Sequence, residues 1–428
     1  MNKRLLIITY YWPPYAGGGV QRWLKFAKYL PEYNWTPIIY TPENPSYSLQ
    51  DQSLLEDVSE KLEVIKRPIW EPYDLANIFK NKNSKESLNT GQTNKSSKSK
   101  KVLNWIRGNF FIPDPRKFWV KPSIAFLGKY LEANPVDAVI TTGPPHSMHL
   151  IGLGLKKKFD TNWIVDIRDP WSSFDLLEEY QVSSGNLKKY QDLESEVLKN
   201  CDRVIATSPS MPTKLQSFNQ NKFFPITNGF DTSDFKDFKD TSAADNLVLY
   251  HAGLMSGLRN PTNFWKALNQ LLLEKLISKD KFTLNLVGVV ESSVEDSINT
   301  FDHLSKTYVR EDYKNHKEVI TDYQTANVLM LFVNNTDNAK VNIPGKSFEY
   351  LATGKPILCF TSGNTDIANI LKTLDHCLVL DYNEEVPKVK KKLITFFSNI
   401  LNASTLDINK YSRSHLTSLL VQLLDNLT

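Results

Sequence analysis

The chain has 428 residues, 41% of them hydrophobic and 23% charged, which suggests two or three globular domains and excludes a single small binding module, a disordered tail or a fibrous repeat. Seven of the 51 basic residues, but only one of the 47 acidic residues, lie in Lys80–Lys101. The remainder, with 44 basic and 46 acidic residues, is nearly neutral, and this balance argues against a nucleic-acid partner.

The first forty residues have the pattern of a strand, a glycine turn, a helix and a second strand. Leu5–Ile8 is a continuous apolar run, typical of a strand that is buried on both faces of a parallel sheet. Val20–Leu30 places its apolar residues on one helical face, and Pro37–Tyr40 supplies the next strand. We therefore expect the chain to open with a βαβ unit.

A basic segment and an aromatic segment follow. Lys80–Lys101 is rich in Lys, Ser and Asn and lacks apolar periodicity, so it is expected to be a mobile insertion. Residues 102–131 interleave aromatic side chains with Arg and Lys, and the part 102–121 is expected to meet anionic lipid headgroups. The alternative is a buried helix pair with its cations at the rim.

The remaining strand patterns form two series. The first continues with apolar runs at 138–140, 163–165, 203–206 and 224–226. The second begins after the polar stretch 231–245, with runs at 247–250, 284–287, 328–333 and 356–359. The pattern predicts an α/β protein with two doubly wound, Rossmann-like domains, residues 1–235 and 236–405. A last helix, within 406–428, lies beyond the second sheet and is expected to pack back on the first domain.

Ligands of open parallel sheets bind where strands end, so the residues after each strand are the candidates. Gly17, Gly18 and Gly19 allow the backbone to approach a ligand closely, and the helix start behind them offers N–H groups to an anion. Their spacing matches neither the dinucleotide fingerprint nor the P-loop. A turn that merely joins strand to helix is the alternative.

Two further strand ends in the first domain carry polar side chains. His146 follows the rigid turn 143–145, where its imidazole is expected to orient a substrate hydroxyl or accept a proton. Asp166 and Arg168 are expected on one side of the next strand end, and an internal ion pair that fixes the loop is the alternative there. Residues 228–231 are expected to form a structural turn.

The second domain carries candidate cations. Gly253 ends its first strand, and Arg259 follows, where a planar guanidinium suits a phosphate. Lys346 and Glu349 fall three residues apart on one face of a short helix that ends near Gly354. A cation for phosphate and a carboxylate for ribose hydroxyls would thus project side by side. An exposed Lys–Glu helix pair is the alternative.

Over nearly its full length the chain resembles the GT-B glycosyltransferases of retaining family four, the group that includes mannosyl- and lipopolysaccharide-type transferases. Five segments carry the resemblance: YYWPPYAGGGVQR, TTGPPHS, VDIRDPW, ITNGFD and IPGKSFEYLATGKPIL. The resemblance implies two Rossmann-like domains that face an interdomain cleft. It also implies that Gly17, Gly18 and Gly19 lie near the donor diphosphate and that Glu349 holds the nucleotide ribose.

Three positions depart from the family pattern. Val341 stands where the family has the first glutamate of its E-x7-E pair. The family has a basic pair after the first strand of the second domain, and of this pair only the cation at Arg259 is present. Lys346 is expected to share the phosphate-binding role of Arg259. The family histidine position holds Thr142, so His146 is a displaced substitute.

The resemblance implies retaining transfer of a sugar from a nucleotide diphosphate to a hydroxyl of a glycan or lipid-linked saccharide, in cell-surface polysaccharide assembly. The expected catalytic residues are His146, Arg259 and Lys346, with Gly253 on the donor side, and the expected acceptor side is Arg22, Thr142, Arg168 and Asp169. No cofactor or metal is expected, because the cations and helix N-termini would stabilise the leaving diphosphate. A nucleotide-sugar epimerase and a non-catalytic protein that binds nucleotide sugars or assembles at the membrane surface are the alternatives.

The location is expected to be cytoplasmic, with peripheral binding to the inner face of the plasma membrane. The three cysteines are too few and too scattered for a disulfide framework or a zinc site, which indicates a reducing compartment. The apolar stretch at the N-terminus is too short for a signal peptide, and no run of about 18 apolar residues occurs.

Overall fold

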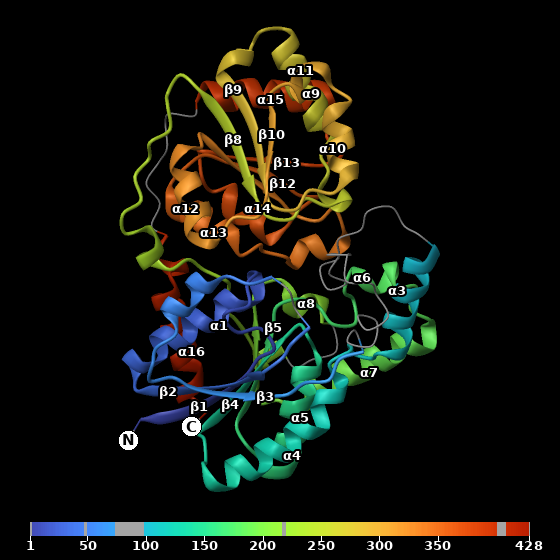
Figure 1. Cartoon of the computed structure of the whole chain (residues 1–428), viewed down its shortest axis with the longest axis vertical. Coiled ribbons are helices and arrows are strands. Elements are labelled where there is room, and N and C mark those ends of the chain that lie inside the picture. The colour runs from blue at the N-terminus through green and yellow to red at the C-terminus, as the bar shows by residue number, and fades with distance from the viewer. Residues whose placement is uncertain (1, 47–48, 73–97, 216–219, 400–407, 428) are drawn as a thin grey trace. The chain divides into compact units, whose positions relative to one another are not determined.

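The computed structural model describes residues 2–46, 49–72, 98–215, 220–399 and 408–427 (Figure 1). These residues divide into two compact units, which are described separately. The first contains the described residues before Asn228 together with Arg413 onward, and the second runs from Asn228 to Ser412. Most of the predicted basic insertion lies outside the described residues, but Lys98–Lys101 already belong to a helix, so the expected loop is wrong there.

The first unit is built on a seven-stranded parallel sheet with the order β3-β2-β1-β4-β5-β6-β7 in the described residues. Its strands are β1 (Lys3–Ile8), β2 (Trp35–Pro42), β3 (Glu63–Arg67), β4 (Ala138–Gly143), β5 (Trp163–Ile167), β6 (Arg203–Ala206) and β7 (Phe223–Pro225). Its α-helices are α1 (Gly18–Tyr29), α3 (Lys98–Phe110), α4 (Lys117–Ala133), α5 (Ser147–Phe159), α6 (Leu176–Glu179), α7 (Ser184–Asn200), α8 (Met211–Lys214) and α16 (Arg413–Asp425). Short 3-10 helices occur at η1 (Leu30–Tyr33), η2 (Gln52–Asp57) and η3 (Gln220–Lys222).

The centre of this sheet is apolar because helices cover it. Residues Leu5–Ile8 of β1 are completely buried, as the continuous apolar run predicts. In register, Leu6 of β1 lies between Ile38 of β2 and Val139 of β4. The C-terminal helix α16 lies beside α1 (Figure 1) and adds leucines to the same core cluster. Its end is tied down by Asp425, which accepts hydrogen bonds from Lys3 at 3.0 Å and Trp35 at 3.2 Å.

The second unit is built on a six-stranded parallel sheet with the order β10-β9-β8-β11-β12-β13 in the described residues. Its strands are β8 (Leu247–Ala252), β9 (Phe282–Val287), β10 (Tyr308–Glu311), β11 (Val328–Phe332), β12 (Ile357–Phe360) and β13 (Cys377–Leu380). Its α-helices are α9 (Thr262–Leu273), α10 (Ser292–Asn299), α11 (Asp302–Ser305), α12 (His316–Thr325), α13 (Lys346–Thr353), α14 (Asp366–Leu371) and α15 (Val386–Ser398). The 3-10 helices are η4 (Thr232–Phe235), η5 (Gly257–Arg259), η6 (Lys279–Lys281), η7 (Asp337–Val341) and η8 (Asn409–Tyr411).

Alternate residues of these strands enter two core clusters, which lie on opposite faces of the sheet. Met330 of β11 packs in the cluster that includes residues of α9, α10 and α15. Its neighbours Leu329 and Leu331 pack in the cluster that includes residues of α12, α13 and α14. Successive strand side chains point to opposite faces, so helices cover both sides of the sheet. The second predicted doubly wound series is therefore confirmed.

Candidate functional site

The carboxyl ends of three adjacent strands bring the predicted residues of the first unit together. The glycine turn follows β1, the Pro-Pro turn follows β4 and Arg168 follows β5, and these strands are neighbours in the sheet. A Cβ atom added to Gly19 would lie 2.8 Å from Nη1 of Arg168. Nε of Arg168 donates to the Gly143 carbonyl at 3.2 Å, and Nη2 donates to the Pro144 carbonyl. Arg168 thus joins the loop after β4 to the glycine turn.

The carboxylate of Asp166 connects the residues at this edge of the sheet through hydrogen bonds. Its buried carboxylate accepts from Arg22 Nη2 at 2.9 Å, Trp23 Nε1 at 2.7 Å and Thr142 Oγ1 at 2.8 Å. Burial alone would raise the pKa of Asp166, but the guanidinium of Arg22 outweighs it and lowers the pKa. The predicted alternative of an internal ion pair applies to Asp166, but its partner is Arg22 and not Arg168.

Two residues expected on the acceptor side are therefore engaged within the protein. Arg22 is 0% exposed and Thr142 is 2% exposed, and the side chains of both already donate to Asp166. Arg22 also donates to the carbonyl groups of Ile226 and Thr227. Its geometry is that of a positioning residue. Arg168 and Asp169, the other two expected acceptor-side residues, are partly exposed.

His146 lies just before α5 and is 7% exposed. Its ring stacks on Trp171 with 4.9 Å between centroids and 4° between planes. Burial lowers the pKa of His146 well below its usual value, and the neighbouring His149 and Arg168 lower it further. The imidazole is therefore neutral at neutral pH, a state that suits hydrogen bonding to a hydroxyl better than proton uptake.

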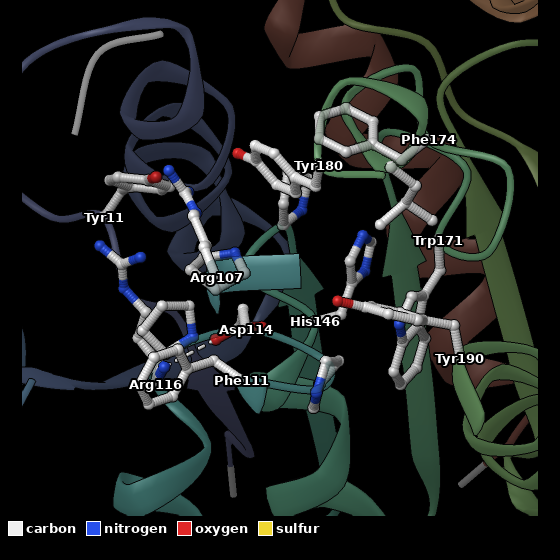
Figure 2. Close-up of a pocket in the computed structure, with 15 residues that line it drawn as sticks. Tyr11, Arg107, Phe111, Asp114, Arg116, His146, Trp171, Phe174, Tyr180 and Tyr190 are labelled. Atoms are coloured by element: carbon white, nitrogen blue, oxygen red, sulfur yellow. Dashed lines mark hydrogen bonds between the residues drawn. The ribbon is translucent and has the colours of Figure 1, made fainter. Parts of the chain in front are cut away.

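His146 and Trp171 line a pocket of about 100 Å³ in the first unit (Figure 2). Most of its other walls are aromatic or proline side chains, contributed by the segment after α3, the Pro-Pro turn and the segment from α6 to α7. Asp114 also lines the pocket and accepts from both the backbone N–H and the hydroxyl of Ser147, each at 2.8 Å. The sequence singled out His146 but not Trp171 or Asp114.

In the second unit, three of the four expected donor-side residues meet where β8 ends. Nζ of Lys346, at the start of α13, donates to the Ala252 carbonyl at 2.5 Å. Gly253 has φ +135°, and a Cβ atom added there would lie 2.3 Å from Nζ of Lys346. Arg259 donates to Oδ1 of Asn334 at 2.6 Å and interacts electrostatically with Lys346. Burial, and then Arg259, lower the pKa of Lys346 to about 7.

Glu349, the fourth expected donor-side residue, lies one turn further along α13. Its side chain is 20% exposed, and it is held by Nε2 of His316 at 3.1 Å and by the Tyr323 hydroxyl at 3.4 Å. Both partners come from α12, which the sequence patterns did not connect with Glu349. The negative charge of Glu349 offsets a small part of the lowering of the Lys346 pKa. Gly354 ends the helix in the left-handed conformation with φ 69°, as expected.

Two further positions bear on the donor side. Val341, at the place of the missing family glutamate, lies in η7 and is 3% exposed, so it offers no charge to a ligand. His251 of β8 is buried, and its Nδ1 lies 2.8 Å from the Met330 carbonyl. His251 lies near the end of β8, two residues before Gly253, and the sequence patterns assigned it no role.

Among the described residues, no three His, Cys, Asp or Glu side chains lie close enough together to hold a metal ion. No helix within the described ranges is long and apolar enough to cross a membrane.

Solved structures share this architecture. The chain matches the sucrose-phosphate synthase of Thermosynechococcus elongatus with a TM-score of 0.66 at 13% identity, over 99% of both chains. It matches the lipopolysaccharide outer core galactosyltransferase WaaB with a TM-score of 0.60 at 10% identity, over 100% of both chains. A Listeria monocytogenes protein named as a UDP-N-acetylglucosamine 2-epimerase matches with a TM-score of 0.56 at 10% identity, over 100% of this chain and 96% of that one.

No family model and no curated protein sequence matches the chain. At these identities the structural matches establish the fold alone. The chain has the GT-B fold, with two doubly wound, Rossmann-like units built on parallel sheets of seven and six strands in the described residues.

Proposed function

We propose that the protein is a retaining glycosyltransferase that takes its sugar from a nucleotide diphosphate. The observation that carries the proposal is the convergence of Lys346 and Arg259 at Gly253, with Glu349 one turn away. Two cations beside a glycine, which allows a ligand to approach the backbone closely, suit a diphosphate. A carboxylate fixed by hydrogen bonds suits ribose hydroxyls. The names of the structural neighbours, a galactosyltransferase and a sucrose-phosphate synthase, support the same class of reaction.

In the proposed reaction, the bond between the sugar's anomeric carbon and the diphosphate oxygen breaks as a bond to the acceptor oxygen forms on the same face. The acceptor's proton passes to the departing phosphate. Lys346 and Arg259 stabilise the charge that develops on the diphosphate, in the place where it develops. Lys346 must be protonated for this, and the bound diphosphate favours that form because it places negative charge beside the ammonium.

The acceptor is assigned to the exposed edge of the first unit. Arg168 and Asp169 are its accessible polar residues, while Arg22 and Thr142 act through Asp166. We assign the acceptor to a glycan or lipid-linked saccharide used in cell-surface polysaccharide assembly. The proposed reaction uses no resident cofactor or metal, because the cations of the second unit supply the positive charge that stabilises the leaving diphosphate.

Glu349→Ala tests the central assignment. Purified wild type and variant are incubated with uridine, guanosine and thymidine diphosphate sugars plus a panel of saccharide acceptors, and nucleotide release and glycoside formation are followed. The variant should lose at least about tenfold in kcat/KM, the scale of a lost charge-assisted hydrogen bond. Lys188→Ala, at an exposed ion pair in the first unit, is the matched control. Unchanged turnover in Glu349→Ala would remove the assignment.

The same assay separates the alternatives. An epimerase, the activity for which one structural neighbour is named, would interconvert sugar nucleotides without any acceptor. A non-catalytic protein would bind sugar nucleotides, visible as thermal stabilisation, without turning them over. Transfer requires both substrates, so only a transferase gives an acceptor-dependent product.

We also propose that the first unit binds an anionic membrane surface through α3 and the start of α4. Of the predicted segment 102–121, Trp119 and Arg116 are buried, as in the buried-pair alternative. Trp105, Phe110 and Phe118 instead expose 43, 59 and 42% of their surface, together with Val102 and Leu103 at 55 and 50%. The ammonium group of Lys117 lies over the Phe118 ring, 5.4 Å from its centroid, and exposed aromatic rings beside cations suit a lipid headgroup layer.

Vesicle co-sedimentation tests the membrane proposal. Binding to vesicles with anionic lipid should exceed binding to neutral vesicles and should fall with salt. Trp105→Ser combined with Phe110→Ser should weaken binding, whereas Leu276→Ser, at a leucine that is 57% exposed in the second unit, should not. Absence of binding at low salt would overturn the proposal.

A further inference from the structure

The stacked pair His146 and Trp171 carries three polar atoms that the protein leaves unused. Nδ1 and Nε2 of His146 and Nε1 of Trp171 are buried, and none has a hydrogen-bond partner in the described part of the chain. His146 is 7% exposed and Trp171 is 2% exposed. Buried polar groups without partners are rare and costly in native proteins, so three of them on one stacked pair need an explanation. Both side chains line the pocket in Figure 2, where a ligand can supply the missing partners.

The other polar groups of this pocket already have partners. Arg116 forms an ion pair with Glu71 at 2.7 Å, and Asp114 accepts from Ser147. The Tyr190 hydroxyl donates to the Gly108 carbonyl at 2.9 Å. Arg107 lies over the ring of Tyr180, 5.2 Å from its centroid. The polar atoms that remain for a ligand are therefore those of a neutral imidazole and an indole N–H.

The remaining walls are apolar rings. Prolines 113, 115, 144 and 145 and the aromatic rings of Phe111 and Phe174 lie around the stacked pair. A volume of about 100 Å³ is small beside the 300–1,000 Å³ of pockets for drug-sized ligands, so the pocket has room for no more than one ring.

We propose that this pocket, the His146 pocket, binds one uncharged, hydroxyl-bearing sugar ring of the acceptor. The inference rests on the proposed transferase function and narrows its acceptor class. A hydroxyl both donates and accepts, so one hydroxyl of the ring can accept from the indole N–H and another can exchange a hydrogen bond with one nitrogen of the neutral imidazole. The C–H faces of the ring pack on the aromatic walls. A charged ring would bring its charge among apolar rings, at a desolvation cost that a neutral ring avoids.

Binding to the pocket is measured without any nucleotide, by nitrogen-15 NMR of the histidine rings and the tryptophan indole groups. The probes are methyl glycosides of neutral hexoses, compared with the methyl glycosides of a hexuronic acid and of an aminohexose. Neutral glycosides should shift the resonances of His146 and Trp171 and bind at least about tenfold more tightly than either charged probe, a difference of about 1.4 kcal/mol. Tighter binding of the uronate, for example through Arg107, would overturn the proposed class, and so would absence of any shift with every neutral probe.

Two variants connect the pocket to the reaction. Trp171→Phe keeps an aromatic ring but removes the N–H, and His146→Ala removes the imidazole. Each should raise KM for the acceptor several-fold and leave donor binding unchanged, while His303→Ala on α11 should change neither. If all transfer is absent but glycosides still shift His146, the transferase proposal fails and the pocket stands. If transfer proceeds and neither variant changes the acceptor KM, the pocket proposal fails alone.

Discussion

Lys346 occupies the space that a side chain on Gly253 would need. Its Nζ donates to the Ala252 carbonyl at 2.5 Å and lies 2.3 Å from the position of a Cβ atom on Gly253. Gly253 also has φ +135°, a conformation that residues with side chains rarely adopt. The glycine and the lysine thus depend on each other, and the cation keeps its place because position 253 has no side chain.

Gly253→Ala should therefore damage the proposed diphosphate site more than an ordinary methyl addition. The added Cβ must displace the ammonium group, and the positive φ adds backbone strain of order 1–3 kcal/mol. We expect a lower unfolding midpoint and at least about tenfold weaker binding of nucleotide diphosphates, since a charge-assisted contact is lost. Calorimetry and thermal unfolding measure the two effects. The comparison variant is Gly185→Ala, where an added Cβ meets nothing within 4 Å. Equal behaviour of the two variants would contradict the argument.

Nucleotide diphosphate binding should take up a proton above pH 7. The pKa of Lys346 is lowered to about 7 by burial and by Arg259, so the free protein loses this proton as the pH rises through 7. A bound diphosphate favours the protonated form, and affinity should fall by up to about tenfold per pH unit above 7. Titration calorimetry in buffers of different ionisation enthalpy measures the uptake. Lys346→Met should abolish it, and an uptake that persists in this variant would assign the proton elsewhere.

The lowered pKa of Lys346 also makes the free energy of unfolding depend on pH. The folded-state pKa of Lys346 lies below its unfolded value of 10.5, so between about pH 7 and 10.5 the unfolded chain binds more protons than the folded chain. The contribution of Lys346 to the free energy of unfolding should therefore rise with pH across this window and stay constant below it. Subtracting the pH dependence of Lys346→Met from that of the wild type isolates this contribution. A difference that falls with pH would contradict the assigned shift.

Glu349 should account for recognition of the ribose. Wild-type protein should bind a 2′,3′-dideoxynucleoside diphosphate at least about tenfold more weakly than the ribonucleotide, because the carboxylate loses its hydroxyl partners. In Glu349→Ala the two ligands should bind alike. His316→Ala, which removes one group that orients Glu349, should give an intermediate difference. A full preference for the ribonucleotide in Glu349→Ala would move ribose recognition to another residue.

The strands that the sequence revealed and those that it missed differ in burial. β1 and β11 are covered on both faces and appear as continuous apolar runs. The missed strands are β3, β10 and β13, and each forms an edge of its sheet. β3 has the sequence EVIKR, without a buried residue. An edge strand buries less of its surface, so β3 requires no apolar run. β13 has the apolar sequence CLVL, but only its last residue is buried, and the sequence analysis did not identify it as a strand.

In the candidate site, too, some residues could be predicted from the sequence and others could not. The rule that ligands meet strand ends identified Gly253 and Arg259, and the spacing to Glu349 on one helical face identified Lys346. Gly253, Arg259 and Lys346 lie together in the structure. Partners contributed by distant segments could not be predicted in this way. Arg22 and Asp166 are separated by 144 residues, and His316 and Glu349 belong to different helices. Such pairs depend on tertiary packing, for which a single sequence provides no periodicity.

Substitution of Arg22 tests whether this residue acts by neutralising the buried carboxylate of Asp166. Arg22→Met should destabilise the first unit by about 3–5 kcal/mol, because it leaves the Asp166 carboxylate buried without its countercharge. Lys188→Met breaks a pair whose side chains are 69 and 59% exposed, and should cost less than about 1 kcal/mol because water already screens both charges. Hydrogen exchange of the β5 amides reports on the first unit and measures both losses. If Arg22 instead contacts the acceptor directly, Arg22→Met should raise the acceptor KM while leaving the exchange rates close to those of Lys188→Met, a result that would contradict the positioning role.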